Sequence, residues 1–221
     1  MAIGQSGPRR PADEDPSLFE DGRLGLNKNL DEADAVTSIR KTFHSVVAQG
    51  WKPDTVSGAD DAEIEAWARA QGVTRIPSAV REVLSLIGKR HGIWFAGTYF
   101  GVEEVTPSSK QGAISCVRYT HDGLSDTPGM LVISDHQAYS YDVIDGSDLH
   151  SPDPPVWSIV EGEGAIAYYD STSSWFERLA PNLERYRSQI RMFRKIGKSP
   201  PRVITRSFDL SDFGDEAPSV G

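Results

Sequence analysis

Apolar residues recur at helical spacing in the first part of this 221-residue chain. Over residues 34–50 they recur every three or four positions, the spacing of one face of an α-helix, and this pattern predicts the first helix. A second helix is predicted over residues 60–72, because Asp60 and Glu63 have the spacing of a capping box just ahead of an apolar run. A third is predicted to begin at Pro77, a residue suited to the first helical turn.

The pattern then changes to short runs of β-prone residues. They are residues 93–95, 98–102, 130–133, 139–143, 156–160 and 165–168. Residues 134–138 predict a hairpin loop between two of these runs, and residues 108–119 predict a short helix. Helical spacing returns after Asp170 and again after Pro181. Helices followed by consecutive strands, and then by further helices, predict the α+β class with a mostly antiparallel sheet.

Both ends of the chain differ from its middle in composition. Gly, Pro, Asp and Glu dominate residues 1–30, and apolar residues there are scattered. Such a composition buries too little apolar surface to offset the entropy lost on ordering. We therefore expect residues 1–30 to be a disordered N-terminal tail and residues 198–221 to be a C-terminal tail. The remaining residues, 31–197, are predicted to form one domain.

Charge is distributed unevenly along the chain. The 23 Lys and Arg against 32 Asp and Glu give a net charge of −9, which argues against a surface that is basic throughout. Residues 119–177 hold 11 acidic and no basic side chains, whereas residues 178–206 hold nine basic and one acidic. Basic residues surround the apolar row of the predicted helix at 181–198. This helix either packs its apolar face on the sheet and offsets the acidic block, or its cations form a binding surface.

The chain also lacks the marks of several protein classes. Cys116 is the single cysteine, so the sequence supports no internal disulfide and no cysteine-based zinc site. The N-terminal residues are not followed by the apolar stretch of a secretory signal, and no run approaches the roughly 18 apolar residues of a membrane span. We therefore expect a cytoplasmic protein with no membrane contact.

No residue spacing in the chain is typical of a catalytic or cofactor site. A Gly-x-Ser-x-Gly elbow, a His-Glu-x-x-His pair and a glycine-rich phosphate loop are all missing. Asp142, Asp145 and Asp148 are spaced by three, unlike the alternating ligands of an EF-hand, so a turn is the simpler interpretation. We therefore expect no cofactor, no bound metal and no enzymatic activity.

Five segments, in order, resemble motifs of the SUKH superfamily, which is named for a fungal cell-wall synthesis regulator and for bacterial toxin-immunity proteins. They are a proline-initiated helix at 76–86, a strand and turn at 129–135, an aromatic strand at 139–142, a Pro-Val-Trp strand at 155–157 and a closing helix at 173–179. The resemblance spans residues 58–180. It implies a twisted antiparallel sheet with helices packed around it and a concave groove that binds protein partners. In bacterial members it implies neutralisation of a toxin, often a nuclease, without catalysis by the immunity protein.

The leading hypothesis is a non-catalytic protein-binding domain, an immunity protein that neutralises a basic nuclease toxin domain through an acidic sheet and loop surface. Aromatic side chains supply contact energy and carboxylates steer encounter. On that ground the expected contact residues are Asp135, His136, Tyr139, Tyr141, Asp142, Asp145 and Trp157. The alternative is a regulatory scaffold or nucleic-acid-binding protein that acts through helix 181–198, with Arg187, Arg191 and Arg194 as contacts.

Overall fold

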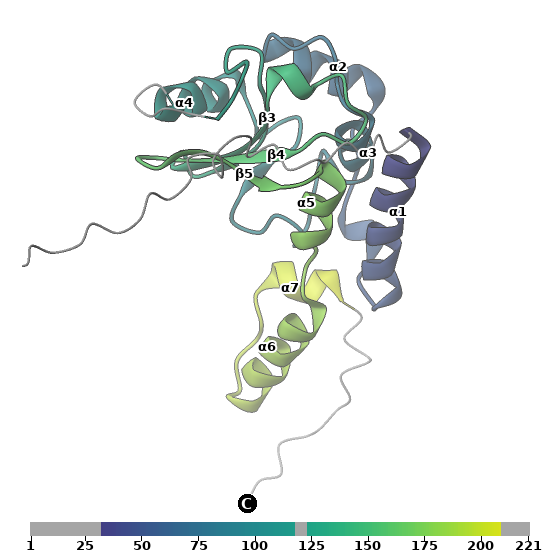
Figure 1. The fold of residues 1–221 in the computed structure, drawn as a ribbon. Coiled ribbons are helices and arrows are strands. Elements are labelled where there is room, and N and C mark those ends of the chain that lie inside the picture. The colour runs from purple at the N-terminus through teal and green to yellow at the C-terminus, as the bar shows by residue number, and fades with distance from the viewer. Residues whose placement is uncertain (1–31, 118–122, 209–221) are drawn as a thin grey trace, which may run out of the picture.

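The computed structural model describes residues 32–117 and 123–208, which form helices around one sheet (Figure 1). The α-helices are α1 (Glu32–Ala48), α2 (Asp61–Ala70), α3 (Ser78–Ile87), α4 (Pro107–Val117), α5 (Thr172–Arg178), α6 (Leu183–Lys195) and α7 (Arg202–Ser207). The strands are β1 (Tyr99–Phe100), β2 (Leu131–His136), β3 (Ser140–Ile144), β4 (Val156–Val160) and β5 (Gly164–Tyr169), with short 3-10 turns η2 (Pro53–Thr55) and η3 (Gly146–Asp148). The predicted tail at 1–30 lies outside the described residues.

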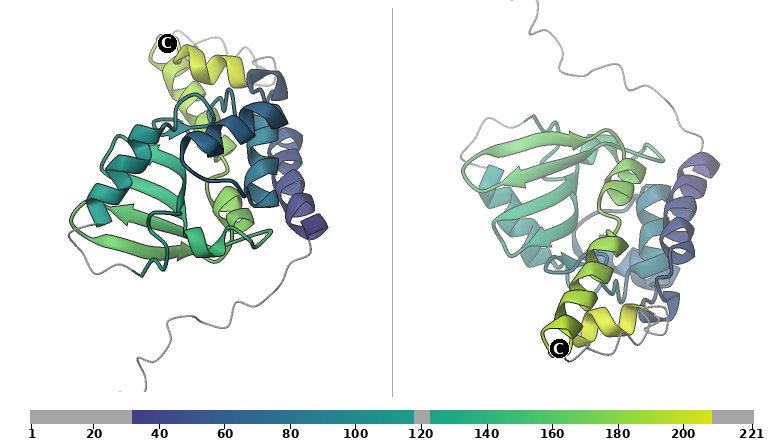
Figure 2. Two further views of the ribbon diagram at one scale, coloured as in Figure 1. Left: turned by 90° about the horizontal axis from the view of Figure 1, so that it is seen from above. Right: turned by 90° about the horizontal axis from the view of Figure 1, so that it is seen from below.

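The three N-terminal helices confirm the helical pattern of the sequence. α3 packs against both α1 and α2, and the three lie beside one end of the sheet (Figures 1 and 2). The predicted capping box is present, since the backbone N–H of Glu63 donates to Asp60 Oδ1 and that of Asp60 donates to Glu63 Oε2, both at 2.9 Å. Pro77 stands immediately before α3, as its fixed backbone angle suggests.

The five strands form one antiparallel sheet in the order β1-β2-β3-β4-β5, which confirms the α+β class. Each strand pairs with its sequence neighbour. The short β2–β3 and β4–β5 turns favour antiparallel pairing, whereas α4 lies in the connection between β1 and β2. β2 continues to His136, so the β2–β3 turn is shorter than the loop predicted at 134–138. Gln137 and Ala138 in this turn have positive φ angles of 54° and 64°.

Register and alternation divide the sheet into two faces. Ser134, Asp142, Ser158 and Ile166 lie opposite one another on successive strands and share one face. The neighbouring row, which contains Tyr141, points to the other face and packs under α4. Figure 2 shows α4 across that second face, whereas the first is covered by a helix, α5, at one end.

The run at 93–95 was predicted to be a strand, and this prediction is wrong. These residues form turns, and their rings are buried among the helices. The ring of Trp94 stacks on Phe176 of α5 at 4.4 Å, and that of Phe95 stacks on Phe100 of β1 at 4.0 Å. The apolar character of the run therefore reflects burial of a loop in the aromatic core, which a short apolar run alone does not distinguish from a strand.

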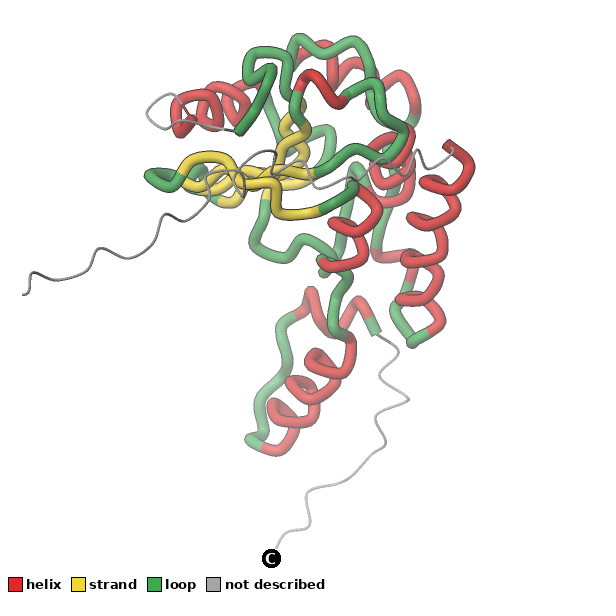
Figure 3. The backbone as a smooth tube through the Cα atoms, viewed as in Figure 1, coloured by secondary structure: helices red, strands yellow, loops and turns green. Residues whose placement is uncertain are grey.

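The C-terminal helices α6 and α7 form a hairpin that projects away from the sheet (Figure 3). The predicted tail at 198–221 is wrong for its first part, because residues 202–207 form α7 and Phe208 is buried. Phe208 pairs with Trp51 in an isolated β-bridge, and the Lys52 N–H donates to the Ser207 carbonyl at 3.0 Å. An apolar anchor at position 208 thus fixes this segment to the N-terminal half of the domain.

Candidate functional site

The face of the sheet opposite α4 is largely open. No helix within the described ranges crosses it apart from α5 at one end (Figure 2, right). Ile166 on this face is 52% exposed, and Tyr168 nearby on β5 is 64% exposed. An uncovered sheet face with large exposed apolar side chains is typical of an interaction surface. We call this surface the open face.

A groove of about 360 Å³ lies where the open face meets the 93–98 loop and the end of α5. Its polar lining comes from the sheet and the loop, and its apolar lining from the loop and the residue after α5. The lining residues are Trp94, Phe95, Ala96, Thr98, Ser134, His136, Ser140, Asp142 and Leu179. The groove therefore combines hydrogen-bonding groups on its sheet side with aromatic and aliphatic walls.

Asp142 is the acidic residue among those that line the groove. Its Oδ2 accepts hydrogen bonds from the Ser134 hydroxyl at 2.8 Å and from the Trp175 indole N–H at 3.1 Å. Burial raises the pKa of Asp142 from its ordinary value of 3.8, and the hydrogen bonds from Trp175, Ser134 and Ser158 oppose the shift. The carboxylate is thus held in a fixed position by neutral donors.

His136 lies on the same side of the sheet, at the end of β2. Its Nδ1 is 2.5 Å from the Thr98 hydroxyl, and its ring meets the Tyr139 ring edge-on at 5.3 Å. Among the described residues no hydrogen bond joins this imidazole to a carboxylate. The arrangement therefore lacks the third group that orients a general base beside a nucleophile.

The structure brings three of the seven predicted contact residues together: His136, Tyr139 and Asp142. The expectation for the other four is corrected. Asp135 and Asp145 are 7% and 2% exposed and accept backbone hydrogen bonds inside the domain, and Tyr141 is 2% exposed beneath α4. Trp157 is half-buried on the face that carries α4, with its ring against Gly123.

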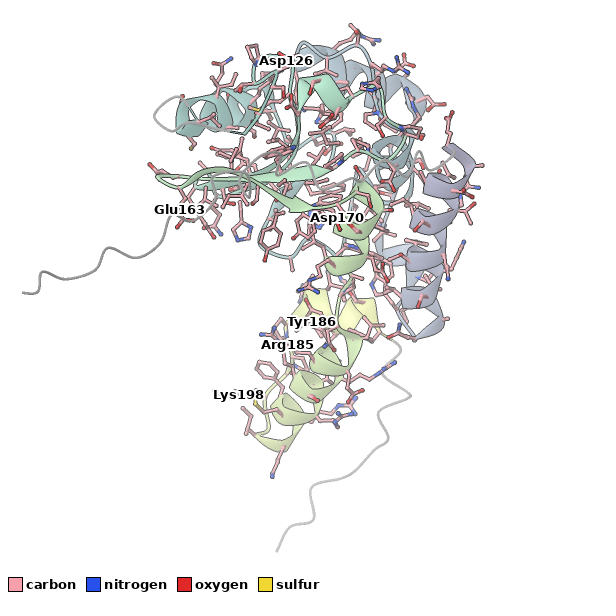
Figure 4. The ribbon with its side chains drawn as sticks, in the orientation of Figure 1. Asp126, Glu163, Asp170, Arg185, Tyr186 and Lys198 are labelled. Atoms are coloured by element: carbon pink, nitrogen blue, oxygen red, sulfur yellow. The ribbon has the colours of Figure 1, made fainter. Side chains whose placement is uncertain are left out.

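The predicted acidic surface is also corrected, because the acidic block does not form one patch. Asp135, Asp145 and Asp153 are buried, and Asp153 accepts hydrogen bonds from the Ser173 hydroxyl and N–H at the start of α5. Three exposed acidic residues lie at separate places in Figure 4. They are Asp126 on the side of α4, Glu163 at the β4–β5 turn and Asp170 beside α5.

The basic helix of the alternative hypothesis is α6, and its apolar side packs toward α7 and Phe208 instead of the sheet. Arg187 donates to the Gln49 carbonyl, and Arg191 pairs with Glu184 at 2.6 Å. Arg194 is exposed. Met192, Ile196 and Val203 are large hydrophobic residues, each at least half exposed, on the same hairpin. The predicted contacts Arg187 and Arg191 are therefore engaged within the fold.

Several groove residues could not be identified from the sequence. Thr98 in the groove, and Trp175, which donates to Asp142, lie 38 and 33 positions along the chain from the strand residues that they contact. Ser134 was assigned to the predicted hairpin loop at 134–138. A possible signal was the polar alternation of Ser140 and Asp142 within β3, since alternate strand residues share a face.

Nowhere in residues 32–117 and 123–208 do three His, Cys, Asp or Glu side chains gather as a metal site would need. No helix in the described part of the chain is long and apolar enough to cross a membrane. No protein-family model matches the chain, and no curated protein matches it. The SUKH assignment therefore stays a prediction that depends on its motifs.

Proposed function

We propose that the chain is a non-catalytic protein-binding domain whose open face receives a basic protein partner. Its specific form is that of an immunity protein that neutralises a toxin domain, as the SUKH resemblance implies. The observation that carries the proposal is the uncovered sheet face, on which Ile166 and Tyr168 are more than half exposed beside the groove. Aromatic and aliphatic side chains around a pocket are the usual anchors of a protein interface.

The charge of the segment that forms the sheet supports a basic partner. No Lys or Arg occurs between residues 119 and 177, the stretch that supplies β2 to β5. The exposed residues Glu163 and Asp170 stand at the two ends of β5, so negative charge flanks the apolar centre. A polar, charged rim around an apolar centre favours fast encounter with a partner of opposite charge. Nuclease domains carry cationic clefts for their substrate and have the matching sign.

The test uses the product of the adjacent gene as the candidate partner. We expect a stable complex with the wild-type chain, protection of cells that co-express the toxin domain, and loss of both with Ile166→Asp. Val203→Asp is the matched control, because Val203 is also half exposed but lies on α7 of the C-terminal hairpin and not on a strand of the sheet. A complex that Ile166→Asp leaves unchanged, or no complex at low salt, would overturn the proposal.

A second candidate function, a nucleic-acid-binding or regulatory scaffold, is favoured by one observation. The α6–α7 hairpin projects from the domain, and Arg185, Lys195 and Lys198 on it are exposed. Such a surface binds phosphates through charge, with strong salt dependence. A mobility shift of duplex DNA at low salt that Lys195→Glu and Lys198→Glu weaken would support this candidate. No shift at low salt would exclude it.

A further inference from the structure

Asp142 in the groove forms no ion pair among the described residues, and His136, which lines the same groove, acts on it electrostatically from beyond ion-pair distance. None of the ion pairs formed within the described residues includes Asp142, and its hydrogen-bond donors Ser134 and Trp175 are neutral. Burial without an opposite charge makes ionisation of this carboxyl group costly, even when it accepts hydrogen bonds, and therefore favours its neutral form. A ligand that brings a positive charge into the groove would offset that cost.

The opposite side of the groove is apolar. Trp94, Phe95 and Leu179 line it, and the first two rings are held by stacking on Phe176 and Phe100. Arginine and lysine bury their methylene stems along apolar surface while their charged ends reach polar groups. A volume of about 360 Å³ is at the lower end of ligand pockets, which run from roughly 300 to 1000 Å³. The space is therefore large enough for the side chain of an arginine or a lysine.

We propose that the groove binds a single basic side chain, arginine or lysine, with Asp142 as its counter-ion. This inference rests on the proposed function, since the side chain would belong to the protein partner on the open face. Asp142 and Ile166 lie in the same cross-strand row, two strands apart. A partner that covers Ile166 is thus positioned to insert a neighbouring residue into the groove. Held aromatic walls reduce the ordering cost of that insertion.

The experiment titrates the full chain with N-acetyl-arginine methylamide and follows the tryptophan indole signals by nitrogen-15 NMR. The Trp175 indole N–H donates to Asp142, so its signal reports directly on that carboxylate. The chain has five tryptophans, and Trp175→Phe identifies the signal by its loss. The matched probe is N-acetyl-citrulline methylamide, which has nearly the same shape but no charge. The same titration with N-acetyl-lysine methylamide separates the two basic side chains.

We expect the arginine or lysine probe to shift the Trp175 signal with a dissociation constant on the order of 1 mM. Citrulline should bind at least about tenfold more weakly. Asp142→Asn should abolish this discrimination, and its spectrum shows whether the variant is folded. Ala96→Phe, which fills the groove without changing Asp142, should also block the shift, whereas Glu177→Gln, an exposed carboxylate on α5, should leave it intact.

Equal shifts with charged and neutral probes would overturn the inference, and so would discrimination that survives both groove variants. These outcomes are separate from a failure of the proposed function. If Ile166→Asp abolishes the complex while the probes bind alike, the open face binds a partner but the groove takes no basic side chain. If the probes discriminate and no complex forms, the groove binds a cation and the proposed protein partner is wrong.

Discussion

Replacing Asp145 by alanine removes the acceptor of three backbone hydrogen bonds. The carboxylate accepts from the N–H groups of Ser125 at 2.5 Å, Asp126 at 2.8 Å and Ser147 at 3.1 Å. The carboxylate caps η3 and links the segment before β2 to the end of β3, and Asp145 is 2% exposed. The variant therefore tests whether this part of the acidic block acts in folding, as the structure indicates, and not in partner contact.

The expected loss follows from these three bonds. A hydrogen bond to a charged group contributes about 1.5 to 3 kcal/mol, and partly exposed donors recover some of this from water. A value of roughly 1 kcal/mol for each bond gives a loss of about 3 kcal/mol in the free energy of unfolding. Domains have roughly 5–15 kcal/mol of stability, so the variant should remain folded. With an m-value of about 2 kcal/mol per molar urea, the midpoint should fall by about 1.5 M.

The assay is urea unfolding followed by tryptophan fluorescence, with Asp170→Ala as the control. Asp170 belongs to the same acidic block and carries the same charge, but its side chain is exposed. We expect Asp170→Ala to change the midpoint by less than about 0.3 M, which corresponds to the ±0.5 kcal/mol of ordinary surface changes. If Asp145→Ala matches this control, the structural role assigned to Asp145 is wrong.

Two further predictions concern the backbone and pH. Gly101 has φ +97° and would place a Cβ 2.1 Å from the Gly88 carbonyl oxygen, whereas Gly162 has φ +82° with open space around it. Gly101→Ala should therefore cost about 3 kcal/mol or more in urea unfolding, and Gly162→Ala about 1 kcal/mol; equal losses would contradict the close approach. Burial lowers the pKa of His91 from 6.5, with Glu104 opposing, so the unfolded chain takes up this proton first as pH falls. The stability that His91 contributes is fully present above pH 6.5 and is lost as the pH falls toward the pKa of the folded state. His91→Gln should therefore weaken the pH dependence of the free energy of unfolding, measured by urea denaturation at a series of pH values. An unchanged pH dependence would assign the effect to other groups.

The helices at 61–70 and 78–87 could be predicted because their signals are local. A capping box spans three residues, and an apolar face repeats every three or four. The antiparallel pairing of β2 with β3 and of β4 with β5 could be predicted for a related reason, since a short turn joins the two strands of each pair. The prediction of a strand at 93–95 is wrong because these apolar residues belong to a loop that packs into an aromatic core. A buried loop and a buried strand have the same apolar composition over so short a run.

The candidate site could be predicted only in part. Asp135 and Asp142 are both strand carboxylates in the acidic block, yet the first is turned inward and the second lines the groove. Which strand face receives α4 depends on the packing of a helix from an earlier part of the chain. The same packing buries Tyr141 under α4, whereas Tyr139, in the turn before β3, is 47% exposed. The number of charged residues along the chain does not indicate which face of the sheet α4 covers.

The sequence by itself determined the helices with local caps, the order of the strands, and a stretch from 119 to 177 without cations. The tertiary structure decided which carboxylates cap backbone groups and which line the groove. It also joined Thr98 to His136 and Trp175 to Asp142 across more than 30 residues, and it fixed Phe208 beside Trp51. The physical reason is that helix caps and turns depend on near neighbours, whereas a groove depends on strand register and on the helix that covers the opposite face.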